Sequence, residues 1–165
     1  MKKTLLILSL SALLILSGCG KSGNVVEYND SFVDLVKECT DSTQDLFQVY
    51  QASDSTLDSI SESLDNSIKI CENAKDKSSK MWDFDKDSSL KDAVVDLLST
   101  EVSYLKKFSS TSRYWNIEDI TDEDKAAYDS IVNELYQEEE ILNSKFTALQ
   151  STQEAFAAKH GLKLE

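Results

Sequence analysis

The chain contains no proline, and only one of its four glycines, Gly161, lies beyond Gly23. Tight turns between β-strands depend on these two residue types, because glycine adopts positive φ angles and proline presets the geometry of the turn. The long stretch between Gly23 and Gly161 is therefore unsuited to a sheet of short strands. Its apolar residues recur instead at spacings of three and four, the period of one face of an α-helix. The sequence predicts an all-α fold of long helices.

The apolar residues fall into four groups separated by polar segments, and we expect one helix for each. The expected apolar stripes are Tyr28, Phe32, Leu35, Val36, Cys39, Leu46, Phe47 and Tyr50; Leu57, Ile60, Leu64, Ile68, Cys71 and Ala74; Leu90, Val94, Leu97, Leu98, Leu105 and Phe108; and Ile131, Leu135, Leu142, Phe146, Leu149 and Phe156. Four amphipathic helices with short links predict an up-down-up-down four-helix bundle. The last helix, at nearly forty residues or about 58 Å, should overhang its neighbours or bend.

The expected ends of these helices carry capping signals. The first helix should begin at Asn24, with Glu27 three residues later as in a capping box. The segment Ser53-Asp54-Ser55 should end this helix and cap the second, and a polar break, residues 76–89, should separate the second from the third. Thr121 should cap the fourth helix, and Gly161 should end it in a left-handed conformation after Lys159 and His160.

Cys39 and Cys71 lie on the stripes of the first and second helices. If the chain turns back at residues 53–54, the two positions are offset by about 4.5 Å along the helix axis. Axes about 8–10 Å apart leave inward Cα atoms about 4–5 Å apart laterally, and a disulfide requires about 4.4–6.8 Å. We therefore expect a Cys39–Cys71 disulfide between these helices. The alternative is a pair of free, buried cysteines that pack as small apolar side chains.

The N-terminal segment has the composition of an export signal. Lys2 and Lys3 precede the apolar run Leu5 to Leu16, which is too short for the roughly 20 residues that a membrane span needs. The run ends in Leu16-Ser17-Gly18-Cys19, which resembles the lipobox of bacterial lipoproteins. The resemblance implies cleavage before Cys19 and diacylation of its thiol. An ordinary export signal with an incidental cysteine is the alternative.

This resemblance divides the chain into three parts. Residues 1–18 would be removed as the signal peptide, residues 19–24 would form the lipidated cysteine and a flexible tether, and residues 25–165 would form the helical domain. Gly20, in place of the aspartate that tends to retain lipoproteins at the inner membrane, implies the outer membrane in a diderm cell. In any other cell it implies the outer face of the cytoplasmic membrane. The ending FAAKHGLKLE, residues 156–165, is similar to that of small helical surface lipoproteins of unknown function, and implies no site.

The chain from Cys19 onward is strongly acidic. It keeps 15 of the 17 basic residues and all 30 acidic ones, for a net charge of about −15. Nucleic-acid binding requires the opposite sign, so we exclude it. The acidity suits a basic partner or loosely bound cations, and a solvated surface that keeps the protein soluble is the simpler interpretation.

Residues that carry catalysis or bind metals are scarce. The single histidine, His160, is expected at a helix end, so neither a di-iron nor a haem site in the bundle core is expected. Asp83, Asp85 and Asp87 match three positions of a calcium-binding loop, but Ser88 replaces its glycine and Val94 its bidentate glutamate. We therefore favour a solvated, helix-capping loop, and expect no metal, no cofactor and no enzymatic activity.

Tyr114, Trp115 and Ile117 lie in the connection to the fourth helix. In the expected bundle this connection shares the end far from the tether with the turn between the first two helices. Exposed aromatic residues there would be candidates for binding a partner, but we favour the alternative that they fold inward over the end of the core. The sequence thus favours a non-catalytic envelope lipoprotein whose helical body binds a protein or cell-wall partner. A cation- or small-ligand-binding bundle is the alternative.

Overall fold

The computed structural model describes residues 23–115 and 121–162. The helices are α1 (Gly23–Gln51), α2 (Leu57–Ser79), α3 (Ser89–Ser109) and α4 (Asp122–Lys159), with a short 3₁₀ helix, η1 (Ser112–Tyr114), after α3. Within these described residues there is no strand, and a single isolated bridge joins Phe84 and Asp87. The all-α prediction is confirmed.

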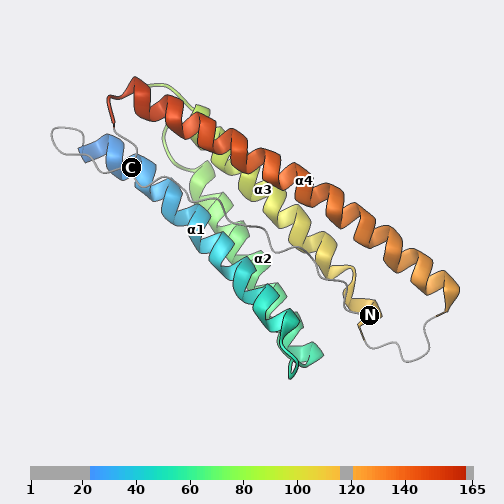
Figure 1. Cartoon of the computed structure of the whole chain (residues 1–165). Coiled ribbons are helices and arrows are strands. Elements are labelled where there is room, and N and C mark those ends of the chain that lie inside the picture. Colours follow the sequence, from blue (N-terminus) through green and yellow to red (C-terminus); the bar gives the residue numbers. More distant parts are fainter. Residues whose placement is uncertain (1–22, 116–120, 163–165) are drawn as a thin grey trace.

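The four α-helices pack into an elongated bundle (Figure 1). The closest packing is between helices that follow one another in the chain: α1 with α2, α2 with α3, and α3 with α4. The 38 residues of α4 make it the longest helix, and Figure 1 shows it running along the whole of α3.

The core follows the predicted stripes closely. Most of the predicted positions are buried, and the remaining ones are half-buried: Leu35, Tyr50, Leu57, Ile68, Ile131 and Phe146. All six apolar residues predicted for α3 are buried. Buried apolar residues that the stripes did not include are Val102, Tyr104, Val132 and Ala157. The helical period was therefore the right guide to the side of each helix that faces the core.

The predicted disulfide is present. The Cα atoms of Cys39 and Cys71 lie 4.6 Å apart, and their sulfur atoms are bonded. Both residues are completely buried between α1 and α2. The spacing agrees with the lateral separation expected from helix packing, so the alternative of two free cysteines is wrong.

The helix ends agree with the sequence in part. Thr121 caps α4 as predicted: its hydroxyl accepts a hydrogen bond from Asp124 N at 3.1 Å. Gly161 has a φ of +68°, and the bond from Leu162 N to the Ala157 carbonyl, 2.9 Å long, completes a Schellman motif. The predicted end of α4 is thus confirmed.

Three predicted boundaries are wrong. Helix α1 begins at Gly23, so Asn24 lies inside the helix and not at its cap, and the last two residues of the expected tether are helical.

The cap of α2 is Thr56, one residue after the predicted segment, because Thr56 and Ser59 form a reciprocal capping box. Helix α2 also extends to Ser79, because the fully buried Ser78 continues its inner face and donates to the Ala74 carbonyl.

Candidate functional site

The residues that the sequence singled out lie in different parts of the molecule. Cys19 and Ile117 are outside the described residues. Cys39 and Cys71 are consumed in the buried disulfide, so neither offers a thiol for chemistry. Tyr114 and Trp115 lie together in and just after η1.

Trp115 packs inward. Its ring lies 5.8 Å from Tyr50 and 5.8 Å from Phe108, and its indole nitrogen donates to the Thr111 hydroxyl at 3.1 Å. The inward arrangement considered as the alternative is therefore the one found for Trp115. The contact with Tyr50 also places the connection after α3 beside the end of α1, at what we call the Trp115 end of the bundle.

Tyr114 is half-buried beside Trp115. Its ring lies 5.5 Å from that of Tyr128, and the exposed Arg113 stacks over it with 4.5 Å between the guanidinium carbon and the ring centre. Arg113 is thus exposed at this end, and Tyr114 keeps part of its surface open to solvent between Arg113 and Tyr128.

A second aromatic cluster lies at the opposite end of the bundle. We call it the Trp82 cluster, and its members are Tyr28, Trp82, Phe84, Phe156 and His160. The ring of Tyr28 lies 5.6 Å from Trp82, 5.3 Å from Phe84 and 5.7 Å from Phe156. The His160 ring lies 4.6 Å from that of Phe156. The cluster therefore joins the first turns of α1, the connection from α2 to α3, and the end of α4.

Trp82 differs from the rest of this cluster because most of its surface is open to solvent. Its exposed fraction is 64%, the larger of the two values recorded for exposed large hydrophobic residues in the described chain. The sequence placed Trp82 in the polar break but gave no sign of its exposure. Only the fold shows that this ring contacts Tyr28 and still leaves most of its surface exposed.

The three aspartates of the calcium-like stretch face separate partners. Asp83 pairs with Lys91, Asp87 pairs with Lys159 at 2.6 Å, and Asp85 lies 3.7 Å from His160 Nδ1. In the part of the chain that the structure describes, no three His, Cys, Asp or Glu side chains converge as metal ligands would. The geometry therefore gives the cation-binding alternative no support.

The N-cap residue of α3 is Ser88, whose side chain makes no capping bond, and Asp87 before it binds a free amide of the first turn. The Asp87 carboxylate accepts a hydrogen bond from Ser89 N at 3.0 Å. Hydrogen bonds from the Lys159 ammonium, and to a lesser extent from Ser89, lower the pKa of Asp87 far below its ordinary value. Asp85 and Lys86 both have positive φ angles, as in the turn types that close hairpins. The Asp87 N–H closes this turn on the Phe84 carbonyl at 2.8 Å.

A buried carboxyl group lies in the middle of the bundle. Glu101 of α3 is only 3% exposed, and Thr43 of α1 donates a hydrogen bond to it at 2.9 Å. Burial raises the pKa of Glu101 from 4.5 to about 7, and the bond from Thr43 opposes the shift. Glu101 was not among the residues expected to be buried, although its position midway between Leu97 and Leu105 on the apolar stripe was an available signal.

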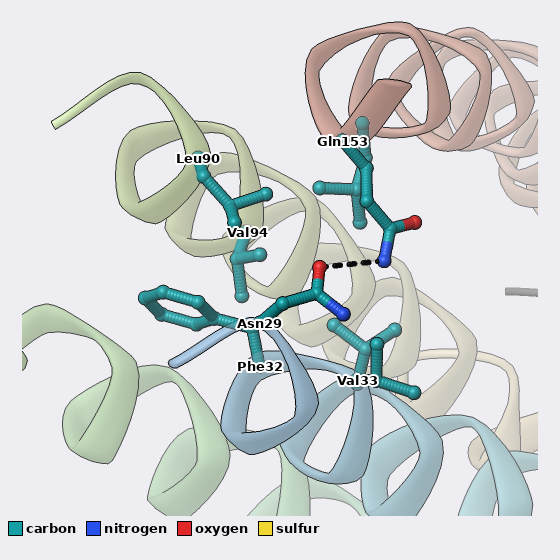
Figure 2. Close-up of a pocket in the computed structure, with 8 residues that line it drawn as sticks. Asn29, Phe32, Val33, Leu90, Val94 and Gln153 are labelled. Carbon is teal, nitrogen blue, oxygen red and sulfur yellow. Dashed lines mark hydrogen bonds between the residues drawn. The ribbon is translucent and has the colours of Figure 1, made fainter. Parts of the chain in front are cut away.

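A small cavity lies between α1, α3 and α4 (Figure 2). Asn29 and Gln153 meet beside it, and the Gln153 amide nitrogen donates to the Asn29 carbonyl oxygen at 2.8 Å. The volume of the cavity, about 10 Å³, is at the lower limit for a single water molecule. It cannot hold an organic ligand, so the small-ligand alternative gains nothing from it.

Within residues 23–115 and 121–162, no helix combines the length and the apolar content that crossing a bilayer demands. No protein-family model, curated protein or solved structure matches the chain.

Proposed function

We propose that the protein is a non-catalytic lipoprotein of the cell envelope, anchored by acyl chains on Cys19, whose helical body binds a protein or wall component. The observation that carries the proposal is the sequence Leu16-Ser17-Gly18-Cys19 at the end of a short apolar run that two lysines precede. Two or more acyl chains hold a protein on a membrane, because each buried CH₂ contributes about 0.8 kcal/mol.

The disulfide supports export. Bonds such as Cys39–Cys71 persist in oxidising compartments outside the cytoplasm and are rare inside it. Both cysteines are fully buried between two packed helices. A bond in this position is consistent with a protein that folds after translocation. Gly20 after the lipidated cysteine favours the outer membrane in a diderm cell, and in any other cell the protein lies on the outer face of the cytoplasmic membrane.

We also propose that the four helices alternate in direction, as in an up-down-up-down bundle. Two sets of contacts support this arrangement. Tyr50 at the end of α1 meets Trp115 after α3, whereas Tyr28 near the start of α1 meets Phe156 near the end of α4. In this arrangement the anchored end of the bundle carries the Trp82 cluster, and the Trp115 end points away from the membrane.

The Trp115 end is the proposed place of partner binding. Arg113 is exposed and Tyr114 is partly exposed there, and arginine and tyrosine are the residue types that often anchor protein interfaces. The charge of about −15 on residues 19–165 favours a partner with a basic surface.

The experiment compares the native protein with Cys19→Ser in the host cell. Intact mass of the membrane-extracted native chain is expected to show loss of residues 1–18 and added acyl mass. Cys19→Ser is expected to leave the membrane fraction, because it lacks the acylated thiol. An uncut leader without acyl mass would overturn the anchoring.

Partner binding is tested in the same cells with a photo-crosslinking amino acid at Tyr114, and at Ile141 as a control. Ile141 is also exposed, at 47%, but lies along α4, away from the Trp115 end. We expect one specific partner to be captured from position 114 and not from position 141. Capture of the same proteins from both positions, or of none, would contradict binding at this end.

A further inference from the structure

The Trp82 cluster lies at the end of the bundle where the chain enters from Cys19. Figure 1 shows the start of α1, the connection between α2 and α3 and the end of α4 at this same end. Tyr28 stands five residues after the start of α1, about 8 Å along the axis, and its ring is 5.6 Å from that of Trp82. Trp82 is thus close to the point where the tether joins the domain.

The tether is short. Gly23, the first residue of α1, lies four positions after Cys19, and these four steps span at most about 14 Å when fully extended. Acyl chains on Cys19 would therefore hold this end of the bundle within a short distance of the lipid headgroups. An exposed side chain beside the start of α1 can reach the membrane surface under this constraint.

The chemistry of Trp82 fits the membrane interface. Tryptophan is enriched at the headgroup level of membranes, because its ring is apolar and its indole N–H can donate to a polar lipid group. Trp82 is 64% exposed, and the half-buried Met81 precedes it. Leaving such a ring in water forgoes the burial of a large apolar side chain.

The charges around Trp82 do not oppose this contact. The segment from Lys80 to Lys91 carries three lysines and three aspartates, so it is neutral in a chain whose net charge is −13. Two of the aspartates are in ion pairs: Asp83 with Lys91, and Asp87 with Lys159. An anionic bilayer would repel most of the acidic protein surface. It would not repel this segment, because the segment has no net charge.

We propose that Trp82 docks the anchored end of the domain on the phospholipid bilayer, inserting its ring at the level of the headgroups. The inference rests on the proposed anchoring through Cys19 and adds a second, non-covalent contact with the lipid. Together, the tether and the ring would fix the orientation of the bundle, with its Trp115 end directed away from the membrane.

The test uses the native lipidated chain in vesicles of phosphatidylcholine and phosphatidylglycerol, part of which carry bromine near the top of one acyl chain. Bromine quenches indole fluorescence only at short range. The chain has two tryptophans, so Trp82→Phe leaves Trp115 at the opposite end as an internal control. We expect brominated lipid to reduce the emission of the native chain and to leave that of Trp82→Phe unchanged.

Equal quenching of the native chain and Trp82→Phe would overturn the proposal, and so would no quenching of either. A blue-shifted but unquenched Trp82 would assign this ring to a protein contact, and also overturns it. Intact mass is measured on the same sample. If the chain carries acyl mass but is not quenched, only the docking of Trp82 is rejected. If the chain carries no acyl mass, the anchoring on which docking depends is rejected.

Discussion

Glu101 places an ionisable group on a face of α3 that otherwise carries apolar side chains. Its neighbours at a spacing of four, Leu97 and Leu105, are each no more than 1% exposed. Removing a carboxylate from water is costly, and a single hydrogen bond from Thr43 offsets only part of that cost. The carboxyl group therefore holds its proton to a higher pH than an exposed glutamate does.

The sign of the pH dependence follows from the raised pKa. The folded state, in which the pKa of Glu101 is about 7, binds a proton more tightly than the unfolded state, in which it is near 4.5. The contribution of Glu101 to the free energy of unfolding is therefore fully present below pH 4.5 and is lost as the pH rises through 7. The loss amounts to about 3 kcal/mol. We expect Glu101→Gln to be more stable than the native chain at pH 8 by up to this amount.

Urea unfolding of residues 19–165 at several values between pH 5 and pH 8 measures this effect. The difference in free energy of unfolding between the native chain and Glu101→Gln should widen as the pH rises. Glu140→Gln, a substitution at an exposed position of α4, is the matched control and should run parallel to the native chain. A constant difference between Glu101→Gln and the native chain would show that Glu101 does not titrate differently on folding.

At the scale of elements, the pairing of α1 with α2 is fixed by a covalent bond. Cys39 and Cys71 are separated by 32 positions in the sequence, and their bond ties the middle of one helix to the other. A cross-link stabilises mainly by restricting the unfolded chain, and a loop of this length is worth about 3–4 kcal/mol. The buried hydrogen bond from Ser67 to the Ser42 carbonyl, 2.8 Å long, adds a second link between the two helices.

We expect reduction of the disulfide to lower the free energy of unfolding by about 3–4 kcal/mol. Both cysteines are completely buried, so the reductant has to be present while the chain is unfolded and refolded. Urea unfolding of residues 19–165 with and without reductant gives the difference. Cys39→Ala/Cys71→Ala, which has no bond to reduce, should not respond to the reductant, and an equal response of both proteins would contradict the prediction.

At the scale of the whole molecule, the proposed alternation of helix directions makes a prediction about which charges meet. Glu72 of α2 lies 2.6 Å from Lys106 of α3, and Asp87, in the connection from α2 to α3, lies 2.6 Å from Lys159 at the end of α4. These pairs are exposed, so each adds little to stability. They report topology well, because they join segments far apart in the sequence.

A zero-length carbodiimide cross-linker followed by mass spectrometry should join Glu72 to Lys106 and Asp87 to Lys159. Both links require a carboxylate and an amine in direct contact, as the structure has them. A link from Lys159 to Asp54, in the turn between α1 and α2, would require α4 to run in the opposite direction. Finding that link in place of the one to Asp87 would reject the up-down-up-down arrangement.

The sequence by itself determined the helical class, the four helices and most of the core. These follow from local physical rules: a chain almost without glycine and proline favours helices, and a period of three to four marks the buried face. The disulfide was also predictable, because the turn between α1 and α2 sets which positions lie opposite each other. The capping box at Thr121 and the glycine at 161 are signals of the same local kind.

The tertiary structure alone decided which polar and aromatic residues the core accepts. Glu101, Asn29 and Gln153 are buried because their partners arrive from other helices, and the stripe of one helix does not reveal those partners. Trp82 and Trp115 both lie in connections between helices, yet one is exposed and the other packs on the core. Exposure depends on what the neighbouring helices place against each ring, and that is a property of the assembled fold.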